Sequence, residues 1–200
     1  MTRRVLDADL FPLLGEPFAV EFANTFYNSG ESVTDFLATR EFFESWFAHA
    51  QAASVYRVPP RLANEHFIKV RELRDAIAAI CGYLSGDSSK VSEATATLNN
   101  YAHLLPGRLE LQWTNPKSPS VSLSLDGGFN ETFLARLASD AITFFASQEG
   151  LRIRRCATPI CTLFFVQEHH RRRFCSEPCS QRTRQSRYYQ VSKYLDRSVS

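Results

Sequence analysis

The sequence predicts a mostly helical α+β protein, with a helical N-terminal domain that carries a small antiparallel hairpin and a C-terminal cysteine module that ends in a basic helix. Apolar residues recur at helical spacing through most of the first 150 residues, and two short segments alternate with the period of a strand. Four of the five cysteines lie in the last quarter of the 200-residue chain. With 44% hydrophobic residues the chain can bury a core, so we expect a globular domain over 1–150 and a smaller module over 151–200.

The N-terminal segment has one ambiguous stretch followed by one clear helix. Residues 17–28 (PFAVEFANTFYN) alternate imperfectly, which fits either an extended segment or a short helix before the polar turn at 28–32. Thr39 is placed to cap a helix that has Glu41 in its first turn. That helix presents four aromatic side chains at helical spacing: Phe42, Phe43, Trp46 and Phe47. We expect it to pack through these rings.

A long amphipathic helix follows the boundary at Pro59 and Pro60 and should end near Gly86. Its apolar residues recur over about six turns. They are Leu62, Phe67, Val70, Leu73, Ile77, Ile80 and Leu84. A further helix should cover much of 90–104.

A hairpin and one more helix complete the predicted N-terminal domain. Segments 108–113 (RLELQW) and 121–126 (VSLSLD) alternate with period two around a turn that contains Pro and Ser, which predicts an antiparallel pair. Residues 130–147 form a continuous apolar face that Asn130 can cap and Gly150 should stop. Because no linker follows, we expect the cysteine module to dock against this last helix.

The cysteine spacing, Cys156-x4-Cys161-x13-Cys175-x3-Cys179, is the strongest chemical signal in the chain. Two short-spaced pairs joined by a loop are typical of a tetrahedral structural Zn²⁺ site, because each pair closes a tight knuckle and the loop lets the knuckles face each other. Four thiolates fill the coordination sphere, so the expected single zinc per chain stabilises a fold and does no Lewis-acid chemistry. Loss of the metal should unfold the module and spare the helical body.

The residues around the cysteines fit a compact zinc knuckle. Residues 163–166 (LFFV) can form a strand over the metal, and Ser176 and Pro178 are placed to begin a helix whose first turn contains Cys179. His169 and His170 are alternative ligands. Their place within an arginine-rich loop favours surface positions instead.

Membrane insertion and secretion are not expected. No apolar run approaches the roughly 20 residues that span a bilayer, and the first 17 residues contain acids and a proline where a secretory signal needs an apolar core. We therefore expect a cytoplasmic protein with no membrane partner. A reducing compartment favours metal ligation over disulfides for the clustered cysteines, and Cys81, in the apolar run AIAAICGYL, fits a small buried core residue.

The net charge of +2 hides a strong asymmetry along the chain. Residues 151–200 contain 11 basic and three acidic residues, a net charge of +8, whereas residues 1–150 contain 12 basic and 18 acidic residues, a net charge of −6. A basic patch concentrated on a compact metal module is typical of proteins that bind a polyanion.

The last helix should have one packing face, with Tyr188, Val191 and Leu195, and one cationic face. Guanidinium groups bind phosphates well, so this face and the preceding loop supply the candidates for nucleic-acid contact. They are Arg171, Arg172, Arg173, Arg182, Arg184, Arg187, Tyr189 and Lys193. The alternative is that these charges form a solvated face or a clasp on the acidic body.

Two groups of motifs resemble a known family. RIRRCATPIC (152–161) and RRFCSEPC (172–179) are similar to a finger pattern that a basic helix follows, while Phe22-Ala23-Asn24-Thr25 and DFLATREFFESWF from Asp35 are similar to two elements of an N-terminal domain. The family is that of bacterial proteins with an ABATE domain and a CGNR zinc finger, described as stress-induced transcription regulators. The resemblance covers nearly the whole chain and implies zinc binding by the four cysteines and a role in transcription.

The resemblance is incomplete at the tetrad that gives the finger its name. This chain has Cys179-Ser180-Gln181-Arg182, which keeps the first and last members, and three residues separate the second cysteine pair where the family has four. The cysteines carry over to this chain. Contacts made by the missing Gly and Asn do not.

The leading hypothesis is a zinc-binding transcriptional regulator that binds DNA through its finger, while the N-terminal domain senses a small molecule or forms a homodimer. Asn24 and Thr25 are candidates for a ligand pocket, because short polar residues in an aromatic segment need hydrogen-bond partners. Local capping is the commoner use of such residues.

Two further functions are weighed. In the alternative, the zinc knuckle presents Phe164, Phe165 and the arginines to an acidic protein partner of the transcription machinery. An enzyme is not expected, because the sequence has no Gly-rich phosphate loop, no HExxH motif and no nucleophile elbow.

Overall fold

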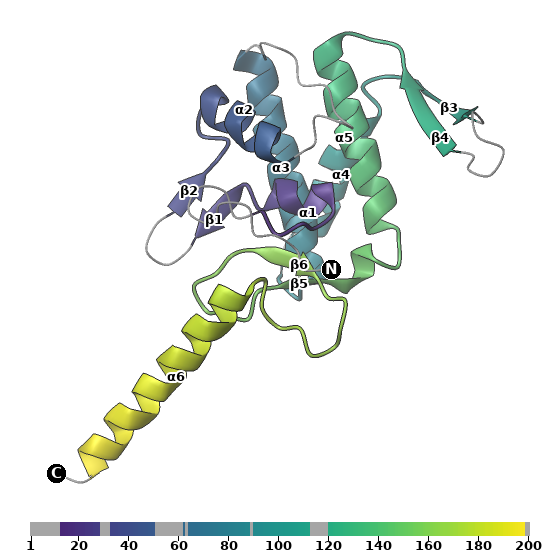
Figure 1. Ribbon diagram of the computed structural model, residues 1–200. Coiled ribbons are helices and arrows are strands. Elements are labelled where there is room, and N and C mark those ends of the chain that lie inside the picture. The colour runs from purple at the N-terminus through teal and green to yellow at the C-terminus, as the bar shows by residue number, and fades with distance from the viewer. Residues whose placement is uncertain are drawn as a thin grey trace.

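The structure, a computed structural model, describes residues 13–28, 33–50, 62, 64–88, 90–112 and 120–198. Five helices and two short antiparallel pairs form a body, from which the cysteine module (residues 150–198) extends (Figure 1). The elements of the body are α1 (Phe18–Ala23), β1 (Phe26–Asn28), β2 (Val33–Asp35), α2 (Arg40–His49), α3 (Asn64–Leu84), α4 (Val91–Ala102), β3 (Gly107–Gln112), β4 (Ser120–Leu125) and α5 (Phe129–Phe145). The cysteine module contains the 3-10 turn η2 (Gly150–Arg152), β5 (Ile153–Arg155), β6 (Phe164–Val166) and α6 (Glu177–Ser198).

The ambiguous segment 17–28 contains both a helix and a strand. Helix α1 covers its first half and strand β1 its end, where Tyr27 pairs with Thr34 of β2. Apolar residues fill α1 on almost every side, and Val20 and Phe22 are fully buried. A helix that is buried on all sides has no polar face, so its sequence lacks the amphipathic pattern that identifies a surface helix. Of the predicted turn, residues 29–32 lie outside the described residues.

Helix α2 begins as predicted, with Thr39 accepting a hydrogen bond from the backbone N–H of Phe42 at 3.3 Å. Phe43, Trp46 and Phe47 are buried and pack against rings of α1 and α5. Phe42 was expected to join them but is 52% exposed. It lies about 100° around the helix from Phe43, outside the arc that positions 43, 46 and 47 share.

Helix α3 is the central element of the body and contacts α1, α4 and α5. It matches the predicted amphipathic helix, and Leu62, placed just before its start, is also buried. The helix ends where Gly86 adopts φ 95°, and the Asp87 N–H closes the turn on the carbonyl of Gly82 at 3.0 Å. Glycine adopts this left-handed conformation without the steric cost that other residues meet.

The predicted hairpin is confirmed, since β3 and β4 pair antiparallel with Leu109 opposite Leu123. Helix α4 is also present, within the predicted range 90–104. The hairpin extends to one side of the helices (Figure 1).

Helix α5 has the predicted apolar face, but its N-terminus differs from the prediction. Gly128, and not Asn130, occupies the capping position, and Asn130 lies inside the first turn with a buried side-chain oxygen that has no partner among the described residues. Gly150 stops the segment for a steric reason: a Cβ at this position would meet the Phe144 carbonyl oxygen at 2.3 Å. The chain can therefore turn back beneath α3 only because residue 150 has no side chain.

The cysteine module shares the core of the body. Ile153 of β5 and Phe164 and Val166 of β6 are buried in the same hydrophobic cluster as α1, α3 and α5. Docking against α5 was expected. The strands instead pack on α3 and α1, and α5 meets the module through η2, because the turn at Gly150 carries the chain away from the α5 surface. Strand β5 was not predicted.

In the part of the chain that the structure describes, no helix combines the length and the apolar character that crossing a bilayer requires.

A buried carboxyl group makes the stability of the body depend on pH. One oxygen of Glu21 accepts the N–H groups of Leu14 and Glu16, both at 2.8 Å, and the other has no partner among the described residues. Burial raises the pKa of Glu21 from 4.5 to about 7, although the backbone hydrogen bonds act in the opposite direction. Between these two values the folded state keeps the proton that the unfolded state releases.

The contribution of Glu21 to the free energy of unfolding is therefore fully present below about pH 4.5 and is lost as the pH rises through about 7, by about 3 kcal/mol. Urea unfolding of the wild type and of Glu21→Gln should show this difference between pH 5 and pH 7.5. The zinc site contributes equally to both proteins, and Glu93→Gln, an exposed change, serves as the control. Parallel pH profiles for Glu21→Gln and the wild type would contradict the assignment.

Candidate metal centre and the finger–body seam

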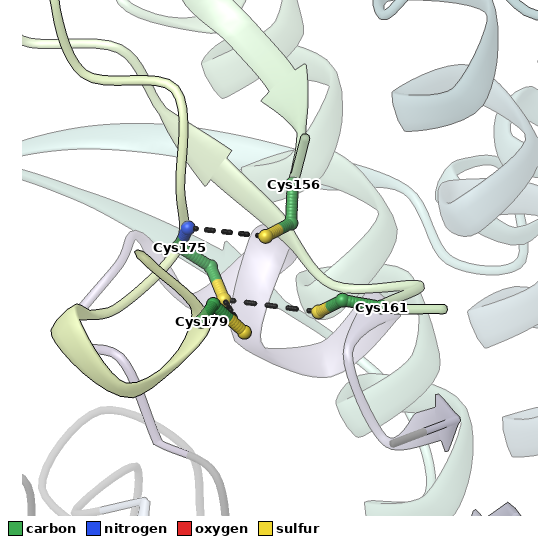
Figure 2. A group of neighbouring side chains, drawn as sticks. All are labelled: Cys156, Cys161, Cys175 and Cys179. Atoms are coloured by element: carbon green, nitrogen blue, oxygen red, sulfur yellow. Dashed lines mark hydrogen bonds between the residues drawn. The ribbon is translucent and has the colours of Figure 1, made fainter. Parts of the chain in front are cut away.

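The four predicted ligands converge on one point. Cys156 follows β5 and Cys161 precedes β6, while Cys175 lies just before α6 and Cys179 in its first turn (Figure 2). All four are buried, and their sulfur atoms lie within 4.8 Å of one another. The Sγ of Cys175 is 3.8 Å from that of Cys161 and 3.5 Å from that of Cys179.

These separations fit a zinc ion and exclude disulfides. A regular tetrahedron with Zn–S bonds of about 2.3 Å has sulfur atoms about 3.8 Å apart, whereas a disulfide needs about 2.05 Å. Hydrogen bonds among the thiols hold the pKa of Cys156 far below its ordinary value and raise the pKa of Cys175 far above it. Four thiolates this close repel one another unless a cation lies between them, so the donor set suits Zn²⁺.

Neighbouring backbone and side-chain groups enclose the four cysteines. The backbone N–H of Cys175 points at the Sγ of Cys156 at 3.5 Å, a contact that supports a thiolate (Figure 2). Phe165 of β6 and Leu163, just before this strand, pack against the cysteines. His169 and His170 are exposed and do not belong to the ligand group, which agrees with the surface positions expected for them.

A threonine pair that the sequence analysis missed links the first knuckle to α6. Thr158 donates to the carbonyl of Cys179 at 3.1 Å, and its hydroxyl meets that of Thr183 at 3.0 Å. Thr183 also bonds the Cys179 carbonyl, at 3.0 Å. Both hydroxyls are buried, so the direction in which α6 leaves the metal site is fixed by hydrogen bonds as well as by the metal.

Strand β6 alternates between two cores. Phe164 and Val166 face the core of the body, and Phe165 between them faces the cysteines. This is the period of two that a strand imposes. The sheet of β5 and β6 therefore separates the metal site from the helical core and touches both.

Backbone N–H and carbonyl groups at the free edge of β6 form hydrogen bonds with side chains of the body. Asn24 donates to the Phe164 carbonyl at 2.9 Å and accepts from the Phe164 N–H at 2.8 Å. Glu16 accepts the Val166 N–H at 3.0 Å. An unpaired strand edge buried against a body would leave these backbone groups without partners. We call these contacts, together with the ion pair below, the finger–body seam.

Arg172 completes the seam. Its guanidinium donates to Glu16 at 2.8 Å and to the carbonyls of Val166 and Cys175, both at 3.1 Å, and stacks over the ring of Phe165 at 4.6 Å. The Glu16 side chain is 1% exposed, so its negative charge depends on this partner. Arg172 was predicted to contact nucleic acid. That contact stays a prediction; within the chain the guanidinium binds the acidic body, an arrangement that the sequence analysis gave as the alternative.

Comparison with known protein families agrees with this architecture. Residues 16–148 match the ABATE family model, described as "Putative stress-induced transcription regulator". The chain belongs to the ABATE family. Residues 152–190 match the CGNR zinc finger, which contains all four cysteines, and the protein therefore holds one structural zinc. No curated protein matches the chain at a significant level.

The two residues proposed to line a ligand pocket of the ABATE body have structural roles instead. Asn24 belongs to the seam. Thr25 is fully buried, donates to the Phe22 carbonyl at 2.7 Å and accepts from Arg74 at 3.3 Å. Arg74 in turn binds Asp35, and although burial by itself raises the pKa of Asp35, the hydrogen bonds from Arg74 and Leu37 hold it below its usual value. Both side chains are buried and form hydrogen bonds within the fold, and a ligand pocket at these residues stays a prediction.

The predicted nucleic-acid contacts of the zinc finger differ in how exposed their side chains are. Arg171, Arg173, Arg184 and Arg187 are exposed, and Arg184 lies 3.4 Å from Glu177. Arg182 is half-buried. For Tyr189 and Lys193 the structure describes the helix backbone but not the side chains.

Of the packing face predicted for helix α6, the structure describes one side chain, that of Tyr188. Tyr188 is 73% exposed, and the helix projects away from the ABATE body (Figure 1). The side chains of Val191 and Leu195 lie outside the described residues.

Replacing Cys175 with Ser tests both the metal site and its link to the body. The variant should lose most of its zinc, measured by elemental analysis. Because Glu16 and Asn24 then lose their ordered partners, unfolding of the whole chain should also shift downward, by about 2–4 °C for each kcal/mol lost. This outcome differs from the isolated unfolding of the module that the sequence suggested.

Cys81→Ala is the matched control, since Cys81 lies in the body core and should leave the zinc content unchanged. Full zinc occupancy in the Cys175→Ser protein would contradict the site.

Replacing Asn24 with Ala should lower the free energy of unfolding by about 2–4 kcal/mol, because two buried backbone groups of Phe164 lose their partner. Urea unfolding of zinc-loaded protein measures the change. Asn99→Ala, at an exposed position of α4, should stay within about 0.5 kcal/mol of the wild type. An equally small effect at Asn24 would show that the seam does not join the two parts.

Proposed function

We propose that this protein is a zinc-dependent regulator that binds DNA through its finger, residues 151–200, in a bacterial stress response. The observation that carries the proposal is the position of α6: a basic helix leaves a rigid zinc site and projects from the body (Figure 1), and Arg184 and Arg187 on it are exposed. Its 22 residues give a length of about 33 Å. A helix of this kind can enter the major groove of duplex DNA.

The charge distribution supports a polyanion partner. Arg187 is exposed and forms no ion pair within the described part of the chain, and residues 151–200 carry a net charge of +8 whereas residues 1–150 carry −6. The Arg184–Glu177 pair is exposed on both sides, at 69% and 63%, so phosphate can displace the carboxylate at little cost.

The runner-up, a module that presents Phe164 and Phe165 to an acidic protein partner, is less well supported. Phe164 is 5% exposed and Phe165 is fully buried, and both rings are occupied within the chain. The arginines remain available to such a partner. The runner-up therefore predicts binding to an acidic protein and none to duplex DNA at low salt.

For the ABATE body we propose effector binding or homodimer formation. A hollow of about 220 Å³ between α3 and α4 is lined by Glu72, Thr97, Asn100, Tyr101 and Leu104, which gives a small polar effector a site in place of Asn24 and Thr25. Thermal-shift measurements with cellular metabolites test this, since a ligand of the folded state raises the melting temperature. A homodimer would suit paired half-sites.

We further propose that the protein is not an enzyme and acts in the cytoplasm. Four thiolates leave the zinc without an open coordination position for water or substrate. Turnover by the zinc-loaded protein of any substrate would overturn the first statement.

Replacing Arg184 and Arg187 with Gln should weaken binding to duplex DNA roughly tenfold or more at low salt, because two charged contacts are lost. The slope of log K against log salt should become shallower by about 1.8. Fluorescence anisotropy with a random 20-base-pair duplex measures both quantities. The control variant, Lys90→Gln with Arg108→Gln, removes the same charge from the body and should change neither the affinity nor the salt slope. An unchanged affinity for the α6 variant would exclude this helix as the contact surface.

A further inference from the structure

The loop before α6 and the first turn of that helix enclose a hollow of about 360 Å³. Arg171 and Arg173 line it, together with Phe174, Ser176, Glu177 and Ser180. Basic groups and hydroxyls are the donors that bind phosphate oxygens in proteins. The hollow adjoins the exposed α6 surface that carries the proposed function, since its lining residues Glu177 and Ser180 both accept hydrogen bonds from Arg184.

The three consecutive arginines have separate tasks. Arg172 is neutralised by Glu16 and held by two backbone carbonyls, so its charge is used within the fold. Arg171 and Arg173, on either side of it, are exposed and form no ion pair among the described residues. Glu177, the carboxylate in the lining, is paired with Arg184. Even when DNA draws Arg184 away from Glu177, the two arginines outnumber this carboxylate, and the hollow keeps a net positive charge.

The loop that carries these two arginines is held rigid. Gln167 donates to the Arg172 carbonyl at 2.8 Å, and the Ala157 N–H donates to the Arg173 carbonyl at 2.9 Å. Cys175 then anchors the loop to the zinc. Binding here would cost little ordering entropy, since the backbone is already fixed. The first turn of α6 adds the positive end of the helix dipole, which favours an anion.

We propose that this hollow binds one backbone phosphate of duplex DNA, with Arg171 and Arg173 as its ligands, and so sets the register of α6 on the duplex. The inference rests on the proposed DNA-binding function and deepens it. Arg187 lies ten residues beyond Glu177, about 15 Å along the helix axis. The major groove is about 12 Å wide, so a helix anchored at a phosphate on one side places Arg187 across the groove.

The test compares Arg171→Gln/Arg173→Gln with the wild type in the full, zinc-loaded chain, using anisotropy of a random 20-base-pair duplex across a salt series. Two arginines that share one phosphate predict a slope of log K against log salt that is shallower by about 0.9. Inorganic phosphate, added at constant ionic strength, should compete with DNA more strongly in the wild type than in the variant. A free phosphate that binds without DNA competition would assign the hollow to a phosphate ligand and overturn the proposal.

Three controls keep the outcomes separate. The variant Lys90→Gln/Arg108→Gln removes equal charge from the body, away from the hollow, and should keep the wild-type slope. The variant Arg171→Lys/Arg173→Lys should also keep this slope, because lysine still contacts phosphate as a point charge. One zinc per chain in each variant shows that the finger is folded. If the wild type binds DNA and the Gln variant keeps its slope, the hollow is not a phosphate site and the proposed function survives. If the wild type does not bind DNA at low salt, both fail.

Discussion

The convergence of four cysteine sulfurs on one zinc ion is the constraint on which the rest of the structure depends. It joins two pieces of chain that have little reason to meet otherwise: the turn between β5 and β6, with Cys156 and Cys161, and the start of α6, with Cys175 and Cys179. The finger has too few apolar side chains of its own to fold without help, and much of what it has is buried in the ABATE body. The metal thus sets the geometry, while Thr158 and Thr183 fix the direction of the emerging helix.

The body and the finger complete each other chemically. Asn24 and Glu16 supply hydrogen bonds to the edge of β6, and Arg172 supplies the positive charge that a buried Glu16 requires. Breaking a buried ion pair by removing one partner costs about 3–5 kcal/mol, so neither part can lose the other without a large penalty. A change in the body that disturbs α1 would therefore reach the loop of Arg171 and Arg173 through one residue, Arg172. Under the function proposed above, this contact is a short path between an effector site in the body and the DNA-binding surface of the finger.

The periodic elements could be predicted from the sequence, and the contacts between distant elements could not. Helices α2 to α5, the β3–β4 hairpin and the cysteine ligands follow from spacing that a single segment displays. Asn24 is an example of a contact that the sequence does not predict. A short polar side chain in an apolar segment predicts that it needs a hydrogen-bond partner, but the partner, Phe164, is 140 residues away. The Arg171–Arg173 run appeared uniform in sequence, and only the fold shows that its middle member faces inward. Strand β5 was missed because two of its three residues are arginines, so it lacks the apolar run that predicted the equally short β6.

Zinc K-edge X-ray absorption of the purified protein can decide whether the four cysteines share one ion, because it reports the identity, number and distance of the atoms bound to the metal. We expect four sulfur atoms at about 2.3 Å and no nitrogen or oxygen ligand. A coordination shell with three sulfurs and one nitrogen or oxygen would contradict it, since the site would then either recruit a histidine from the exposed loop or keep an open position for water.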